Sequence, residues 1–155
     1  LIDEALGYWI HAQAAPLWLE HPLAPVTVGY NDLVLASRPA NQALDTVSFH
    51  QYLAPDDEAP AYSAKVAEDI AGRTARGVLL GEFGWSTHEV DPHRAAELEA
   101  ATLEAARAAG LSGGFKWMLN DASNQPNPRE AAFGLFRADG TAKPSAEALR
   151  GLSLA

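Results

Sequence analysis

Short apolar segments alternate with helical segments along this sequence, and this alternation restricts the fold more than any other feature. Apolar and β-branched residues predict four strands, over 25–32, 46–52, 78–83 and 113–119. Helical patterns predict helices over 3–14, 62–76 and 92–109, and a further helix that starts near Pro144. Strands that alternate with helices of this length form βαβ units with parallel strands. We therefore expect one α/β domain with about four parallel strands, which suits a chain of 155 residues.

The ends of the expected helices are marked by residues that cap helices or break them. Asp91 is a suitable N-cap for the helix over 92–109, and Gly110 follows its last residue. Gly77 stands where a left-handed cap would end the preceding helix. Pro16 is expected to stop the first helix, because proline cannot donate the backbone hydrogen bond of a helix interior. Residues 32–44 are compatible with a short helix.

The composition excludes several classes of function. The chain has no cysteine, so it forms no disulfide, thiolate metal site or cysteine nucleophile. Its formal net charge of −9 argues against a nucleic-acid partner, because proteins that bind nucleic acid are normally basic. No apolar run approaches the roughly eighteen residues of a membrane-spanning helix, so we expect no membrane partner. The first residues, LIDEALGYWIHAQ, lack the features of a signal peptide and resemble the middle of a helix, so we expect a piece of a longer protein.

The stretch GVLLGEFGWST, residues 77–87, places a carboxylate, Glu82, in an apolar strand. An ionised carboxylate in such a strand is costly unless a partner compensates its charge or the carboxylate is used. Strict alternation along the strand would put Glu82 on the same face as Val78 and Leu80. The flanking glycines and the position at the end of the strand favour a functional role for Glu82.

Other polar residues collect at the same ends of the expected strands. Ser48, His50 and Tyr52 alternate onto one face of the second strand. The carboxyl ends of parallel strands are where α/β folds bind ligands. The residues expected to converge at one mouth are Asn31, His50, Tyr52, Glu82 and Trp117. A carboxylate, a tyrosine hydroxyl, an aromatic face and two polar groups that bond hydroxyls suit a sugar.

Most of these residues also have a structural alternative. Glu82 could instead bond backbone amides or an arginine, and His50 with Tyr52 could form a satisfied pair in the core. The tryptophan of the fourth strand could be a core residue, and Trp85, in the loop after Glu82, could equally be a packing residue. The pair His88 and His93 is better explained by a solvated loop before a helix than by a metal. The GLSGG run precedes a strand, which is the wrong end for a phosphate cradle.

The sequence resembles the C-terminal half of a clan A glycoside hydrolase of the cellulase-like family five type. The resemblance is carried by VSFHQY as strand six, GVLLGEFGWST as strand seven, GGFKWMLND as strand eight and FGLFRADGTAKPSAEAL as the closing segment. PVTVGYND then falls at strand five. The resemblance implies a (β/α)₈ TIM barrel, of which residues 1–155 supply strands five to eight of the catalytic domain.

The resemblance also implies roles for individual residues. Glu82 would be the nucleophile of a retaining β-glycosidase, and Tyr52 would donate a hydrogen bond to it. His50 and Tyr52 would line the subsite of the reacting sugar, with Trp117 as the platform beneath it. The further candidates for substrate contacts are Asn31, Trp85, Asn120 and Asp121. Such enzymes need no metal or organic cofactor.

The sequence departs from this family in one large respect. Retaining hydrolysis uses two carboxyl groups about 5–5.5 Å apart. The family carries the second, the acid/base, in an Asn-Glu pair at the end of strand four, and this sequence contains no such pair. We therefore expect the acid/base to come from an upstream half-barrel, or from a second copy of the chain.

Three functions remain open on the sequence alone. The first is hydrolysis of a β-linked oligo- or polysaccharide, and the second is a non-catalytic carbohydrate-binding or assembly fragment of such a barrel. The third is another barrel enzyme, such as an aldolase or a metal-dependent hydrolase. It lacks support because Lys116 alternates away from Trp117 and no set of histidines converges.

Overall fold

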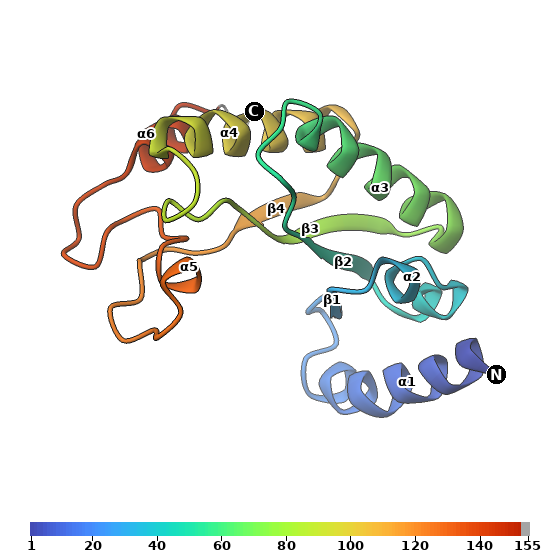
Figure 1. Cartoon of the computed structure of the whole chain (residues 1–155). Helices are drawn as coiled ribbons and strands as arrows, with labels where there is room; N and C mark the ends of the chain where they lie inside the picture. The colour runs from blue at the N-terminus through green and yellow to red at the C-terminus, as the bar shows by residue number, and fades with distance from the viewer. Residues whose placement is uncertain (153–155) are drawn as a thin grey trace.

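The computed structural model describes residues 1–152, which form a four-stranded parallel sheet with helices along one face (Figure 1). The strands lie in the sheet in their sequence order, β1-β2-β3-β4, so the predicted parallel α/β class is confirmed. The elements are α1 (Ile2–Glu20), β1 (Gly29–Tyr30), α2 (Leu33–Ala36), the 3₁₀ helix η1 (Pro39–Ala43), β2 (Thr46–Gln51), α3 (Ala59–Thr74), β3 (Gly77–Phe83), α4 (Pro92–Ala108), β4 (Gly113–Lys116), α5 (Pro128–Ala131) and α6 (Pro144–Arg150). None of the helices described is long and apolar enough to cross a membrane.

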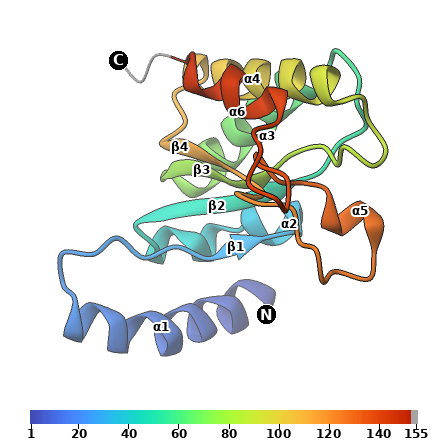
Figure 2. The same ribbon diagram turned by 90° about the vertical axis from the view of Figure 1, so that its left-hand side faces the viewer.

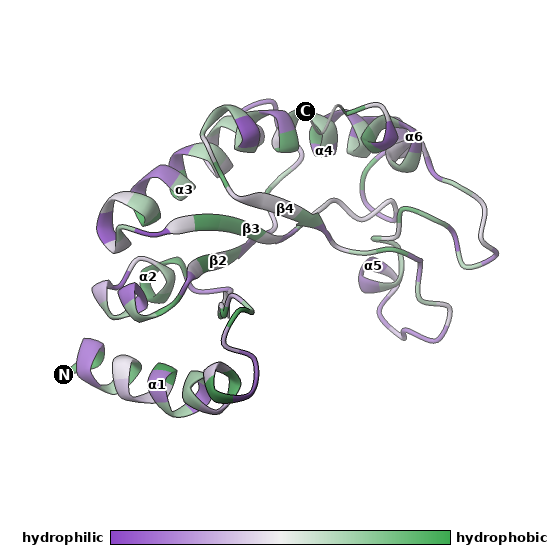
Figure 3. Cartoon of the chain, turned by 180° about the vertical axis from the view of Figure 1, so that it is seen from behind, coloured by the Kyte–Doolittle hydropathy of each residue, from purple (hydrophilic) through white to green (hydrophobic). Residues whose placement is uncertain are grey.

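The main core lies between the sheet and the helices α3 and α4. The strand residues that form it are 3% exposed or less: Val47, Phe49, Val78, Leu80 and Phe83. Figure 3 shows the hydrophobic colour of β2 and β3 beneath helices of mixed hydropathy. Burial of each large apolar side chain contributes about 1.5–3 kcal/mol, so this layer is the main source of stability.

The opposite face of the sheet has no helix over it within residues 1–152, and α1 lies beyond β1 at one edge (Figures 1 and 2). Large apolar side chains are exposed at both edges. Phe115 of β4 is 64% exposed and Leu119 just after it is 65% exposed. At the other edge, Tyr8 and Leu19 of α1 are 80% and 82% exposed. The sheet therefore has the form of an open segment of a barrel wall.

Several boundaries agree with the sequence predictions. The N-cap Asp91 accepts hydrogen bonds from His93 N at 2.9 Å and Arg94 N at 3.2 Å, as expected for the start of α4. Gly110 has a positive φ of 74° just after α4. The last helix begins at Pro144, also as predicted.

Three local predictions are wrong. The helix α1 continues through Pro16 to Glu20, because the rest of its backbone bonds and its packing on η1 hold it. The strand β1 contains only Gly29 and Tyr30, and Val26 before it bonds through its N–H and its carbonyl to Asp45 instead of to a neighbouring strand. The left-handed cap of α3 is Ala75, with φ 53°, while Gly77 begins β3 close to Ser112.

The predicted alternation along β3 is also wrong, because β3 contains a bulge. Phe49 of β2 pairs with Leu80, but the next residue, His50, pairs with Glu82, so Gly81 is the extra residue. A bulge turns the following side chains to the other face. As a result Leu80 and Phe83 both lie in the core under the helices, and Glu82 faces the open side of the sheet.

Candidate active site

A hollow of about 240 Å³ lies at the carboxyl ends of β2, β3 and β4. We call it the mouth hollow, and its lining residues are Asn31, Tyr52, Glu82, Trp117, Arg129 and Glu130. Four of these six were predicted from the sequence to lie together. A larger hollow, of about 610 Å³, lies at the amino end of β4 beside Gly113 and Leu103 and contains none of the predicted residues.

Glu82 is held by Tyr52, the residue after β2, and lies close to His50 of β2. The Tyr52 hydroxyl donates to Glu82 Oε2 at 2.8 Å, as the family resemblance implied. His50 Nδ1 lies 3.4 Å from the same oxygen. The other oxygen, Oε1, has no hydrogen-bond partner within residues 1–152, and the side chain is 28% exposed. One carboxylate oxygen is therefore fixed, and the other is left for a ligand.

Burial and the neighbouring Glu82 carboxylate raise the pKa of Tyr52 well above its ordinary value near 10. The phenol therefore stays protonated and remains a hydrogen-bond donor at neutral and mildly alkaline pH. Its ring is also fixed, because it meets the buried ring of Phe133 edge to face, with centroids 5.5 Å apart. The hydroxyl is thus aimed at Glu82 before any ligand arrives.

Two glycines make room for this arrangement. A Cβ on Gly81 would overlap Ser48 Oγ, and a Cβ on Gly29 would lie 2.5 Å from His50 Nε2. The two strands that flank β2 therefore each need a glycine, Gly29 in β1 and Gly81 in β3, at the position toward which a polar side chain of β2 points. The glycine before Glu82 that drew attention in the sequence serves the bulge, which directs Glu82 to the mouth hollow.

Trp117 follows β4 at the edge of the mouth hollow and is 41% exposed. Its backbone N–H donates to Phe83 O at 2.9 Å, and the peptide bond that joins it to Met118 is cis. The Lys116 ammonium donates to the carbonyl oxygens of Trp117 and Phe133. The backbone of Trp117 is thus fixed on both sides, while its side chain is left free for a flat ligand face.

A buried ion pair lies beneath this loop. Lys116 Nζ is 3.3 Å from Glu99 Oε1 of α4, and the two side chains are 5% and 1% exposed. Desolvation raises the pKa of Glu99 and lowers the pKa of Lys116, and their mutual attraction opposes both shifts. Glu99 also accepts from Trp85 N at 3.3 Å. This network ties α4, β4 and the loop after β3 together.

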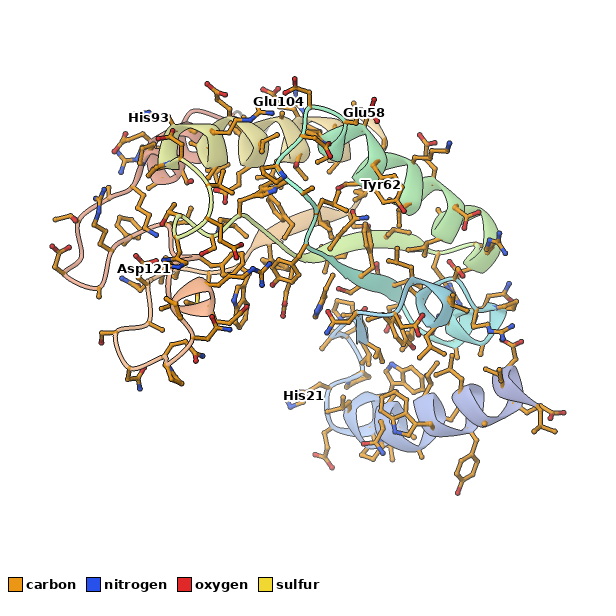
Figure 4. The ribbon with its side chains drawn as sticks, viewed as in Figure 1. His21, Glu58, Tyr62, His93, Glu104 and Asp121 are labelled. Atoms are coloured by element: carbon orange, nitrogen blue, oxygen red, sulfur yellow. The ribbon has the colours of Figure 1, made fainter. Side chains whose placement is uncertain are left out.

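A second buried lysine holds the other end of the loop. Lys143 Nζ donates to Asp121 Oδ1 at 2.7 Å, to Thr87 Oγ1 at 2.8 Å and to Ala132 O at 2.9 Å. Asp121 Oδ1 also accepts from Gly134 N at 2.8 Å. Figure 4 shows Asp121 in the loops beside α5. These contacts all fall on Oδ1, and Asp121 does not line the mouth hollow.

Three other predicted residues also do not line the mouth hollow. His50 lies 3.4 Å from Glu82 Oε2 but is not itself a lining residue. Trp85 is 6% exposed and packs in the core with the residues under the helices. Asn120 is exposed and pairs with Phe136 in an isolated bridge. Asn31, by contrast, follows β1 and lines the hollow.

Arg129 and Glu130 line the mouth hollow but were not predicted. They belong to α5, a helix of four residues in the long loop after β4. Asn127 caps this helix by accepting from Arg129 N at 3.0 Å, and the motif N-P-R-E was the one available sequence signal for it. Nothing in the sequence indicated that this turn folds back against the loop after β3.

Comparison with known proteins gives fold-level matches among solved structures, while no protein-family model and no curated protein matches the sequence. A GH5_18 glycoside hydrolase of Streptomyces cattleya, solved in complex with Manβ1-4GlcNAc, superposes with a TM-score of 0.81 at 19% identity over 95% of this chain and 41% of its own. A GH5_18 structure from Bifidobacterium longum subsp. longum gives 0.60 at 26% identity, over 71% of this chain and 31% of its own.

A family 17 β-1,3-glucanosyltransferase from Rhizomucor miehei gives a TM-score of 0.65 at 17% identity, over 92% of this chain and 56% of its own. The chain therefore spans less than two thirds of the length of each of these structures. The predicted resemblance to part of a clan A glycoside hydrolase barrel is confirmed at the level of the fold.

Proposed function

We propose that residues 1–155 form the C-terminal half of a glycoside hydrolase barrel and carry the nucleophile of a retaining β-glycosidase. The observation that supports this most is the state of Glu82. Tyr52 holds one of its oxygens, with His50 Nδ1 3.4 Å from it, and the other oxygen faces a hollow of about 240 Å³ at the carboxyl end of a parallel sheet. That end of the sheet is where barrels of this kind place their ligands.

In the proposed reaction, Glu82 Oε1 attacks the anomeric carbon of a β-linked sugar. The bond to the leaving-group oxygen breaks as the bond to Oε1 forms, and the result is a glycosyl-enzyme. The Tyr52 hydroxyl keeps Oε2 fixed, so that only one oxygen is free to attack. Trp117 provides a flat apolar surface for the sugar ring, and Asn31 a donor and acceptor for its hydroxyl groups.

The proposed reaction needs a second carboxyl group to protonate the leaving group and then to activate water. Glu130 is the other carboxylate that lines the mouth hollow within residues 1–152, but it is paired with Arg129 at 2.8 Å. We therefore assign the acid/base to an upstream half-barrel, or to a second copy of the chain, placed against the open face of the sheet. The substrate would be a β-linked oligo- or polysaccharide.

A 2,4-dinitrophenyl glycoside tests the nucleophile without the missing half, because this leaving group departs without protonation. The β-mannoside is the first probe, since one structural neighbour was solved with Manβ1-4GlcNAc, and the β-glucoside is the second. We expect a burst of one dinitrophenolate per chain followed by slow turnover, because no general base assists water. Glu82→Gln should abolish the burst, and Glu68→Gln, the same change at an exposed position of α3, should leave it intact.

The alternative function is a non-catalytic carbohydrate-binding fragment, and it is favoured by the absence of a second unpaired carboxylate in the mouth hollow as far as residues 1–152 describe it. The same experiment separates the two functions. Sugar binding without any burst from either probe supports the binding fragment. A burst that persists in Glu82→Gln contradicts the assignment of the nucleophile.

A further inference from the structure

Arg129 and Glu130 bring charged groups to a hollow whose other polar groups, Glu82 apart, are neutral at neutral pH. Their backbone is fixed by the loop after β3, since Ser86 Oγ donates to Arg129 O at 2.7 Å and Thr87 N donates to Ala132 O at 3.1 Å. The side chains of Arg129 and Glu130 are 42% and 40% exposed. The pair is therefore held in place, yet it is open to a ligand.

The guanidinium of Arg129 is already engaged on three sides. Its Nε donates to Glu89 Oε2 at 2.9 Å, its Nη1 donates to Glu130 Oε1 at 2.8 Å, and its carbon lies 5.2 Å from the centroid of the Phe133 ring. Its Nη2 has no hydrogen-bond partner within residues 1–152, and neither has Glu130 Oε2. The pair thus offers Nη2 as a donor and Glu130 Oε2 as an acceptor to a ligand in the mouth hollow.

The charges that line the mouth hollow or pair with Arg129 do not balance. Glu82, Glu89 and Glu130 are three carboxylates, and Arg129 is the single cation among them, so the group carries two net negative charges when all four are ionised. A free arginine would attract the carboxylate of a uronic acid. Here two carboxylates already share the guanidinium, and a third anion would meet Glu82 and Glu130 as like charges.

We propose that Arg129 and Glu130 form a specificity-determining pair that binds hydroxyl groups of a neutral sugar and rejects sugars with a carboxylate. Nη2 donates to one hydroxyl and Glu130 Oε2 accepts from another, beside the Trp117 platform. The inference rests on the proposed function, because it places the pair against the sugar that Glu82 would attack. It concerns binding alone, so it is tested without turnover.

The test compares methyl β-D-glucopyranoside with methyl β-D-glucopyranosiduronate, which differ only at C6. Affinities are measured from NMR shifts of the Trp117 indole N–H and the Arg129 Nε–H, at low ionic strength. We expect the neutral glycoside to bind at least tenfold more tightly than the uronide. Because salt screens the repulsion, 0.5 M NaCl should reduce this preference several-fold.

Variants distinguish the effect of the Arg129–Glu130 pair from the effect of the net charge of the chain. Glu130→Gln keeps the shape of the side chain and should reduce the preference for the neutral glycoside over the uronide about tenfold. Glu68→Gln makes the same change in net charge and should leave that preference within twofold of the wild-type value. Arg129→Lys keeps the charge but loses the planar fork, and it should weaken binding of the neutral glycoside about tenfold. A uronide that binds as tightly as the neutral glycoside overturns the proposal, and so does a Glu130→Gln effect no larger than that of Glu68→Gln.

Failure of this inference is distinguishable from failure of the proposed function. A preference for the neutral glycoside with no dinitrophenolate burst supports the pair and contradicts the nucleophile. A dinitrophenolate burst without any preference for the neutral glycoside contradicts the role proposed for the Arg129–Glu130 pair and supports Glu82 as the nucleophile. Absence of binding of either glycoside at 100 mM overturns the pair whatever the burst shows.

Discussion

The mouth hollow and the buried network beneath it each contain a glutamate, but the two carboxylates are compensated in different ways. Glu99 is 1% exposed and lies 3.3 Å from the Lys116 ammonium, so its charge is met by a full opposite charge in a buried site. Glu82 is 28% exposed and is held through one oxygen by Tyr52, with His50 close by. The first arrangement joins α4 to β4, and the second leaves an oxygen free at a hollow.

This difference separates a structural carboxylate from a reactive one. A buried ion pair gains attraction only by losing hydration, and its carboxylate is not accessible to a ligand. A carboxylate fixed by a hydroxyl donor keeps its hydration on one side and can approach an electrophilic carbon. The comparison predicts that substitutions at the buried pair of Glu99 and Lys116 affect stability, and that substitutions at the mouth hollow affect reactivity.

The largest effect on stability is expected for Lys116→Met. It leaves Glu99 buried without its countercharge and frees the carbonyls of Trp117 and Phe133, so we expect a loss of about 3–5 kcal/mol. For a chain of this length the midpoint of thermal unfolding should fall by roughly 6–20 °C. Calorimetry of the variant measures the change, and Lys65→Met, at an exposed position of α3, is the matched control.

The double variant Lys116→Met with Glu99→Met sharpens this prediction. It removes both charges, so it should be more stable than Lys116→Met alone. If the double variant instead loses the sum of the two single effects, the two side chains do not act as a pair. That result would contradict the structural role assigned to Glu99.

At the mouth, Tyr52→Phe should change reactivity more than stability. The variant removes the donor to Glu82 Oε2 but keeps the ring that packs on Phe133, so the free energy of unfolding should change by less than about 1 kcal/mol. The rate of the dinitrophenolate burst should fall by about tenfold to a hundredfold, because the carboxylate loses its fixed orientation.

The control for Tyr52→Phe is Tyr62→Phe, since Tyr62 lies on α3 away from the mouth hollow (Figure 4). This control should leave both the burst and the stability unchanged. Loss of stability in Tyr52→Phe without any change in the burst would mean that Tyr52 serves packing alone.

The mouth and the buried network differ in how far the sequence predicted them. Tyr52, Glu82 and Trp117 were predicted together because strand order and strand ends are local signals. The face on which Glu82 lies was not predicted, because it depends on the bulge at Gly81, where β3 has one residue more than β2 and where a Cβ would overlap Ser48 of that other strand. Alternation counted along one strand cannot detect such a contact.

The loop after β4 escaped prediction for a related reason. Its position is set by two buried ammonium groups, Lys116 and Lys143, that donate to carbonyls far along the chain. A lysine in a sequence is normally assigned to the surface. Arg129 and Glu130 therefore reached the mouth hollow through contacts that no local pattern indicates.

The smallest effect is expected at Asp45, far from both regions. Its carboxylate accepts from Val26 N at 2.7 Å and from Trp18 Nε1 at 3.4 Å, and these bonds hold its pKa below the ordinary value. The stability that they contribute is present above about pH 3.9, the unfolded value, and is lost as pH falls through the lower folded value.

Asp45→Asn tests this pH dependence. The urea midpoint of unfolding should be slightly higher for the wild type than for the variant at pH 7 and at pH 5. This difference in midpoint should vanish near pH 2. A difference that grows as the pH falls would contradict the sign of the shift.

The central claim is that Glu82 is the reactive carboxylate, and covalent trapping tests it most directly. The chain is incubated with 2,4-dinitrophenyl 2-deoxy-2-fluoro-β-mannoside or the matching glucoside, and its intact mass is measured. Cleavage after Arg76 and Arg94 then releases the peptide 77–94, and fragmentation locates the adduct. The account predicts a gain of one fluoroglycosyl unit on Glu82, absent in Glu82→Gln. An adduct on any other residue, or no adduct with either sugar, would contradict it.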